Sequence, residues 1–300
     1  MRIGIFGGDT ANRTIDDVVA DARQAEVDGF ASYWLPQIFG MDAISTLAIV
    51  GREVPRIDLG TAVVPTYPRH PMMLAQQALT AQAAAGGRFV LGIGLSHQIV
   101  IEGMFGMSFE KPARHMREYL AILVPLVRGE AASFEGQTLS AHGTISVASA
   151  TPCPILLAAL APRMLELAGA VADGTITWMT GPATLADHIL PSINKAARSA
   201  GRPDPRVCAS LPVCITTDPS AARERAAKEF AVYNTLPSYR AMLDREGAEG
   251  PADVAIVGDA ATVTGEINRL GDIGVTDFAP ALFGSRADRS ATREVLVSLL

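Results

Sequence analysis

The chain has 300 residues, of which 49% are hydrophobic and 19% charged, which is enough apolar material for one large core. A net charge of −6 without a long basic run argues against binding to nucleic acid. Three cysteines without a CxxC pair predict no disulfide framework, and with neither a signal-peptide pattern nor a long apolar run we expect a soluble cytoplasmic protein that does not enter a membrane.

The first third of the chain predicts strands that alternate with helices. In chain order we expect a strand at 2–6, a helix at 15–27, a strand at 31–35, a helix at 42–53, a strand at 57–64, a helix at 71–85 and a strand at 88–94. Thr14 is placed to cap the first helix and Gly29 to end it. The last two strands are apolar without alternation, which is typical of parallel strands covered on both faces. Their carboxyl ends therefore lie at the edge where α/β folds bind ligands.

The remaining two thirds continue the alternation with two insertions. In order we expect an irregular connection at 96–107, a helix at 112–128, a hairpin at 134–147, a strand at 155–159, a helix at 163–171, a strand at 175–179, a helix at 183–200, a strand at 206–216, a helix at 220–245 broken at Pro237, a loop at 247–251, a helix that starts at 259 or 262, a strand at 275–281 and a helix at 288–300. Eight strand–helix units without a linker predict an α/β protein with a single (β/α)8 TIM barrel over residues 1–300, with insertions at about 96–111 and 132–150.

Several common catalytic motifs are missing. There is no GxxxxGK[ST] phosphate loop, and Gly92-Ile93-Gly94 lacks the third glycine of a dinucleotide-binding fingerprint. The five histidines do not have metal-ligand spacing, so no metal site is predicted. A serine hydrolase that uses Ser96, with His142 or His188 as its base, stays an alternative, although the barrel pattern disfavours it and the segment around Ser96 departs from a nucleophile elbow.

Two helix starts follow strands at the predicted ligand edge. Ala159, Leu160, Ala161 and Pro162 open one helix, and the N–H groups and positive dipole end of a helix start bind anions without a basic side chain. Thr180 and Gly181 open the next helix in the same way, with an added hydroxyl. The alternative is that both turns are ordinary helix caps of a barrel.

Three collinear segments resemble the luciferase-like flavin and deazaflavin oxidoreductases. They are LGTAVVPTYPRHPMMLAQQALTAQAAAGGRFVLGIGLS, PILLAALAPRMLELAGAVADGTITW and INRLGDIGVTDFAPALFG. They are similar, respectively, to the third-to-fourth-strand region of that family, to its LAG…ADG segment, and to its last helix and eighth strand. Each segment alone is a weak signal, but the three in the right order make a strong one.

The resemblance implies a barrel that binds a flavin-type ring at its mouth, most often the 5-deazaflavin F420 in this subgroup, with FMN as the alternative. The ring would lie over the end of the third strand, where the family commonly has a non-proline cis peptide, here near Thr61, Ala62 and Val63. The cofactor phosphate would lie between the two helix starts. Many relatives have glycines where Leu160 and Ala161 stand, so this chain departs from the family pattern at a point that governs how closely the backbone approaches the phosphate.

The resemblance also suggests residues for catalysis. Gln37 stands where several relatives have a polar pair with a histidine, and it can hydrogen-bond a ring or substrate but cannot exchange a proton near neutral pH. His97 stands where some relatives have a catalytic glutamate, and with an ordinary pKa near ~6.5 it is our candidate proton donor or acceptor. A hydrogen-bonded bystander is the alternative for His97. Trp178 is expected either to cover the ring or to fill the top of the barrel.

These features predict an F420-dependent oxidoreductase that transfers a hydride between the deazaflavin and a small organic substrate. An FMN-dependent luciferase-like monooxygenase and a non-catalytic flavin-binding protein are the alternatives. Barrels of this family usually pair through helices near the second and third strands, so the resemblance also implies a homodimer.

Overall fold

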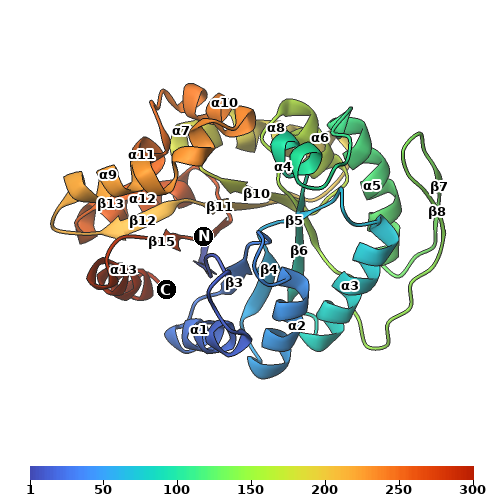
Figure 1. Cartoon of the computed structure of the whole chain (residues 1–300), viewed down its shortest axis with the longest axis horizontal. Coiled ribbons are helices and arrows are strands. Elements are labelled where there is room, and N and C mark those ends of the chain that lie inside the picture. Colours follow the sequence, from blue (N-terminus) through green and yellow to red (C-terminus); the bar gives the residue numbers. More distant parts are fainter.

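A computed structural model describes residues 1–300 and shows parallel strands that form a barrel inside a ring of helices (Figure 1). The strand order is β1-β14-β11-β10-β9-β6-β4-β3-β2. Only Gly4 separates β1 from β2, so the two ends of this order belong to the same stretch of chain and the sheet closes on itself. The predicted TIM barrel is confirmed.

All strands of the protein are short. The barrel strands are β1 (Arg2–Ile3), β2 (Ile5–Phe6), β3 (Ser32–Leu35), β4 (Asp58–Thr61), β5 (Val64–Pro65), β6 (Phe89–Gly94), β9 (Ile155–Leu157), β10 (Gly174–Trp178), β11 (Arg206–Ser210) and β14 (Asp277–Phe278). Outside it are β7 (Ala132–Glu135), β8 (Ser140–Gly143), β12 (Pro212–Ile215), β13 (Ile256–Gly258) and β15 (Ala281–Leu282).

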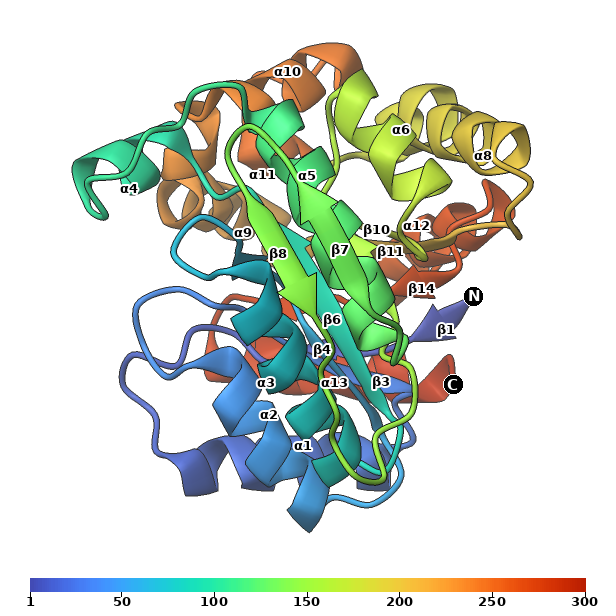
Figure 2. The same cartoon turned by 90° about the vertical axis from the view of Figure 1, so that its right-hand side faces the viewer.

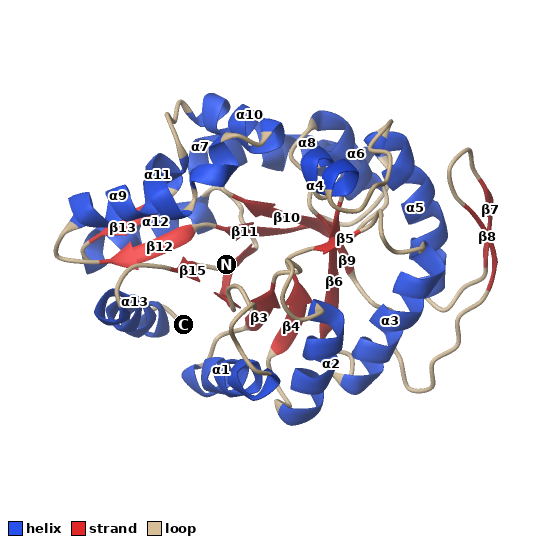
Figure 3. Ribbon diagram, in the orientation of Figure 1, coloured by secondary structure: helices blue, strands red, loops and turns tan.

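Helices surround the strands on the outside of the barrel (Figure 3). They are α1 (Ile15–Asp28), α2 (Ala43–Glu53), α3 (Pro71–Ala84), α4 (Gln98–Gly103), α5 (Pro112–Val127), α6 (Pro162–Ala170), α7 (Pro182–Thr184), the π-helical turn η1 (Leu185–Ile189), α8 (Leu190–Ser199), α9 (Pro219–Glu229), the 3-10 turn η2 (Ala231–Asn234), α10 (Pro237–Glu246), α11 (Pro251–Val254), α12 (Ala260–Asp272) and α13 (Arg286–Ser298). Thr14 and Gly29 cap α1 as predicted, with Asp17 completing a capping box. No helix is long and apolar enough to span a membrane.

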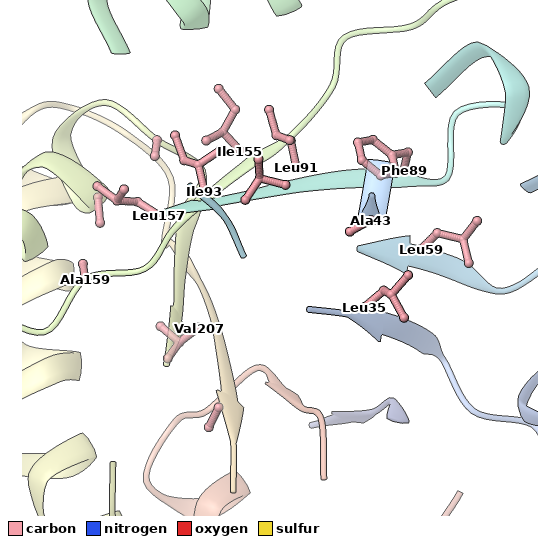
Figure 4. Packing of buried hydrophobic residues seen from close by; sticks show 14 of the residues in the cluster. Leu35, Ala43, Leu59, Phe89, Leu91, Ile93, Ile155, Leu157, Ala159 and Val207 are labelled. Atoms are coloured by element: carbon pink, nitrogen blue, oxygen red, sulfur yellow. The ribbon is translucent and has the colours of Figure 1, made fainter. Parts of the chain in front are cut away.

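Alternate residues of each barrel strand build two apolar layers. One face of the strands packs outward against the helices, where side chains of neighbouring strands such as Leu91, Ile93 and Leu157 lie together (Figure 4). The opposite faces meet inside the barrel in a small cluster made of Trp34, Val90, Leu156, Ile176, Cys208 and Ala279. Burial on both faces explains why the strand sequences do not alternate.

Ion pairs close the amino end of the barrel. Arg206 donates two hydrogen bonds, of 2.8 and 2.7 Å, to the buried carboxylate of Asp277, and its guanidinium lies 5.5 Å from the ring centre of Trp34. Arg2 pairs with Asp58 at 2.5 Å on the same side. With this end filled, the carboxyl end is the open end of the barrel interior.

The seventh-strand region differs from the prediction. The strand expected at 206–216 divides at Leu211, because Pro212 has no N–H with which to continue the ladder of β11. The second half, β12, pairs with β13 and β15 in a separate parallel sheet outside the barrel. We did not predict β13, and the expected loop at 247–251 runs into the short helix α11. The helix expected at 220–245 breaks at Pro237 as predicted, but α9 already ends at Glu229.

The two insertions lie at different places on the barrel. The connection at 96–107, predicted to be irregular, contains α4, and Gly103 forms its last turn rather than a loop. The hairpin β7–β8 starts two residues earlier than predicted and lies on the outside of α5 (Figure 2). The strand predicted at 57–64 is interrupted at residues 62 and 63, between β4 and β5.

Candidate active site at the carboxyl end of the barrel

The floor of the open end is apolar and partly accessible. Phe6, Ala62, Val63 and Ala158 pack on the interior cluster and are each half-buried. The peptide bond between Ala62 and Val63 is cis, so the non-proline cis peptide expected near Thr61, Ala62 and Val63 is present. The structure thus brings Ala62 and Val63 to the mouth, as predicted.

Two glycines of β6 make room for this segment. A Cβ on Gly92 would lie 1.9 Å from the carbonyl oxygen of Thr61, and one on Gly94 would lie 2.8 Å from Val63 and 3.2 Å from Ala158. The Gly-Ile-Gly sequence is therefore explained by close approach of the 61–63 segment. It also places the ends of β4, β6 and β9 at one rim.

Thr61 has a structural role in this arrangement. Its hydroxyl donates to the carbonyl of Gly92 at 2.8 Å and accepts from the N–H of Gly92 at 2.8 Å, and the residue is fully buried. Its side chain therefore joins β4 to β6, and its only hydroxyl donor is used in this contact, which is buried away from the mouth. Of the three residues predicted around the cis peptide, Ala62 and Val63 face the mouth.

A row of aromatic rings crosses the mouth. Phe6 stacks on Trp178 with ring centres 5.6 Å apart, Trp178 meets Tyr233 at 5.8 Å, Tyr233 meets Tyr239 at 5.0 Å, and Tyr239 meets His97 at 5.6 Å. The row runs from Phe6 in β2 to His97 at the start of α4. Trp178 and His97, which we singled out in the sequence, thus lie at the same mouth.

Sequence reasoning missed Tyr233 and Tyr239, which come from η2 and α10. One signal could have found them. About forty residues separate the end of β12 from β13, and long connections on the carboxyl-end side of a barrel commonly carry site residues.

His97 is half-buried at the amino end of α4, and its side chain forms no cap hydrogen bond there. Burial lowers the pKa of its imidazole below the ordinary value of 6.5. The ring is therefore neutral at pH 7 and carries a free lone pair. His97 can accept a proton at the mouth.

Half of the hydrogen-bonding capacity of the Gln37 side chain is used within the protein. Its side-chain oxygen accepts a hydrogen bond of 2.8 Å from the N–H of Ala43, in the first turn of α2. The half-buried side chain therefore holds the start of α2 beside the end of β3. Its amide N–H2 group is the part left for a ligand.

The two predicted anion-binding turns differ. At the start of α6, Ala159 is buried, Leu160 is half-buried, and Ala161 precedes Pro162 with no side chain that caps the helix. The start of this helix keeps the free main-chain donors that an anion requires.

At the start of α7, by contrast, a carboxylate is already in place. Glu246 of α10 accepts from the N–H of Ala183 at 3.0 Å and from that of Thr184 at 2.7 Å. Thr180 is buried and its hydroxyl donates to the carbonyl of Trp178 at 3.2 Å, so it is not turned toward an anion at this start. Gly181 stands against the Glu246 carboxyl group. At the α7 turn Glu246 therefore occupies the donors of Ala183 and Thr184, whereas at the α6 turn the N–H groups of Ala161 and Arg163 have no protein acceptor. Glu246 is a further residue that the sequence did not reveal.

Comparison with known proteins identifies the family to which this barrel belongs. The family model of luciferase-like monooxygenases matches residues 1–277. The chain belongs to the luciferase-like monooxygenase family.

Relatives of this luciferase-like protein have names that specify reactions. It is 30% identical to a 5,10-methylenetetrahydromethanopterin reductase of Methanolobus tindarius, over 80% of this chain and 73% of the relative. It is 29% identical to a putative coenzyme F420-dependent oxidoreductase of Mycobacterium tuberculosis, over 97% of this chain and 83% of the relative. The solved structure of the coenzyme F420-dependent tetrahydromethanopterin reductase of Methanopyrus kandleri has the same fold, with a TM-score of 0.80 at 22% identity and coverage of 99% and 98%.

The luciferase-like site is uncharged where the aromatic row crosses it. Its floor and row consist of alanine, valine, aromatic rings and a neutral histidine. Such a surface favours planar, uncharged groups, because a charge placed there would lose hydration without gaining a partner.

Proposed function

We propose that this protein is an F420-dependent oxidoreductase that transfers a hydride between the deazaflavin and a small, uncharged organic substrate. The observation that carries the proposal is the pairing of two features at one rim: the apolar floor at Ala62–Val63 and the uncapped start of α6. A flavin-type cofactor needs both, a flat apolar surface for its ring and main-chain donors for its phosphate. Relatives named for F420 or for a reductase reaction support the choice of cofactor.

The residues at the mouth fit such a group. Ala62, Val63 and Ala158 would support the ring, and the main-chain donors of Ala161 and Arg163 would hold the phosphate. When bound, F420 supplies a two-electron carrier that reacts at C5. The protein then has to bind the substrate beside that carbon, keep water out and handle a proton.

We assign the proton to His97. Its neutral imidazole can take a proton from a substrate hydroxyl at the ring nitrogen that carries the lone pair, and in the reverse direction the protonated imidazolium gives that proton to the product oxygen. Tyr239 packs against the imidazole ring of His97 and limits the movement of that side chain. Trp178 and Tyr233 are proposed to cover the substrate and exclude water. Gln37 is proposed to orient a ligand through its free amide N–H2 group.

An FMN-dependent monooxygenase is the second candidate, because the matching family is named for monooxygenases. The floor and the start of α6 would serve either ring. A flavin-binding protein without turnover is the third candidate, since Gln37 stands where several relatives have an acid or base.

Visible absorbance titrations test the proposal. We expect the protein to bind F420 in the micromolar range or tighter and to bind FMN much more weakly. An alanine-to-leucine change at Ala62 should abolish binding because the larger side chain covers the floor, while the same change at the exposed Ala231 serves as a control. Binding of FMN alone would favour the monooxygenase, and binding of F420 without turnover on a broad panel of alcohols, ketones and enones would favour the carrier.

A further inference from the structure

A buried histidine holds the turn that starts α6. The Nε2–H group of His188 donates a hydrogen bond of 2.8 Å to the carbonyl oxygen of Leu160, and His188 is only 9% exposed. Leu160 precedes Ala161, the last residue before the helix. The bond crosses 28 positions of sequence, so it is a tertiary contact between two units of the barrel.

This contact sets the direction of a main-chain donor. In a trans peptide the C=O of Leu160 and the N–H of Ala161 share one plane and point in opposite directions. A carbonyl that is fixed toward His188 therefore aims the N–H of Ala161 away from it. Neither the N–H of Ala161 nor that of Arg163 donates to a protein group. His188 thus controls the direction of the free Ala161 N–H group at the start of α6.

The local fold allows the side chain of His188 to reach the carbonyl oxygen of Leu160. His188 lies in η1, where one turn of the helix holds an extra residue between α7 and α8. Such turns change the direction of the side chains they contain and recur at functional sites. Close packing of α6 on α8 helps as well, because a Cβ on Gly169 would lie 2.3 Å from the carbonyl oxygen of Ile193. The distance between the helices therefore depends on glycine at this position.

We propose that His188 is a positioning residue for the cofactor phosphate. By holding the Leu160 carbonyl, it keeps the N–H group of Ala161 aimed at the anion, beside the free N–H group of Arg163. This inference rests on the proposed function, because it requires a phosphate-bearing cofactor at the mouth. A residue that only stabilised the fold would affect all ligands alike, whereas His188 should affect only those with a phosphate.

The experiment compares ligands with and without the phosphate. We would measure the Kd of F420 and of its deazaflavin chromophore without the phosphate by absorbance, for the wild type and for His188→Gln, His188→Leu and His188→Asn. Gln can place an amide N–H2 group near the position of Nε2, whereas Leu has no donor and Asn is too short. The control is His142→Gln, a change of an exposed histidine on the outer hairpin.

We expect His188→Leu and His188→Asn to weaken F420 binding about tenfold, the effect of losing roughly one good hydrogen bond. Binding of the phosphate-free chromophore should stay unchanged in both, and His188→Gln and His142→Gln should behave like the wild type. His188→Asn keeps a polar side chain, so it serves if His188→Leu does not fold.

Two results would overturn the positioning role: unchanged F420 binding in both His188→Leu and His188→Asn, or an equal loss for both ligands. A wild-type protein that binds neither F420 nor FMN would instead overturn the proposed function, and the role of His188 with it. FMN and riboflavin form the equivalent pair of ligands if the protein prefers FMN.

Discussion

Glu246 accepts a hydrogen bond of 2.7 Å from the main-chain N–H of Thr184, so a side chain of α10 closes the start of α7. The same carboxyl group leaves no room at position 181, where a Cβ would lie 2.3 Å from its carbon atom. Because α10 also carries Tyr239, this contact fixes one wall of the aromatic row. The barrel mouth therefore depends on a contact between residues 62 positions apart.

The first prediction concerns Glu246 and Gly181. Glu246→Ala leaves the N–H groups of Ala183 and Thr184 without an acceptor and should lower the free energy of unfolding by about 1 kcal/mol. Gly181→Ala should cost a similar amount in the wild type, because its methyl group displaces the carboxylate. In the Glu246→Ala background, Gly181→Ala should cost almost nothing. Urea unfolding of the four proteins measures this coupling, and simple additivity of the two losses would contradict it.

The second prediction concerns Gly92. A methyl group there would lie 1.9 Å from the Thr61 carbonyl oxygen, so Gly92→Ala has to push the 61–63 segment out of place. We expect a loss of about 3 kcal/mol in the free energy of unfolding, together with loss of cofactor binding. The matched control is Gly265→Ala in α12, where nothing lies within 4 Å of the added carbon. That change should stabilise the protein by about 1 kcal/mol, since alanine favours a helix. Equal effects of the two substitutions would rule out the proposed close approach.

The third prediction concerns stability against pH. His115 stacks on Tyr67 with ring centres 4.0 Å apart, and its Nε2 lies 3.0 Å from the hydroxyl of Thr66. Burial lowers the pKa of His115 to about 4, although the charge of Glu118 partly opposes the shift. Between pH 6.5 and 4 the unfolded chain binds a proton at this residue and the folded protein does not, so stability is full above pH 6.5 and falls as the pH decreases.

Unfolding free energies at pH 7 and pH 5 would measure the effect. His115 should account for as much as about 2 kcal/mol of the loss at pH 5. His115→Gln keeps a hydrogen-bonding group beside Thr66 but cannot titrate, and it should lose less stability than the wild type over this range. An unaltered loss in His115→Gln would assign the effect to other groups.

The fourth prediction concerns His97. If its imidazole exchanges the proton of the reaction, His97→Gln should lower kcat about 100-fold while leaving the Kd of F420 and the melting temperature nearly unchanged. Because burial lowers its pKa, the wild-type kcat/KM should fall with decreasing pH only below 6.5. The measurement is the pH profile of turnover with a substrate from the panel above. A profile that His97→Gln leaves intact would make the histidine a bystander.

Much of the fold was predictable because it depends on short-range signals. The cap of α1 by Thr14 and its end at Gly29 follow from local hydrogen bonding and from backbone freedom. The order of strands and helices follows from runs of apolar residues, which predicted the barrel. The division of the seventh strand at Pro212 and the short strand β13 were missed, because a three-residue strand carries no periodicity of its own.

The candidate site divides in the same way. The sequence by itself determined that small residues occur near Ala62 and that a helix starts after Ala161, since both depend on neighbours in the chain. Only the tertiary structure decided three contacts. The Thr61 hydroxyl is hydrogen-bonded to Gly92, and the Glu246 carboxylate accepts from the N–H of Thr184 at the start of α7. The ring of Tyr239 packs against that of His97. The physical reason is that whether a donor is free or taken depends on side chains from distant parts of the chain, and packing of the whole barrel brings them together.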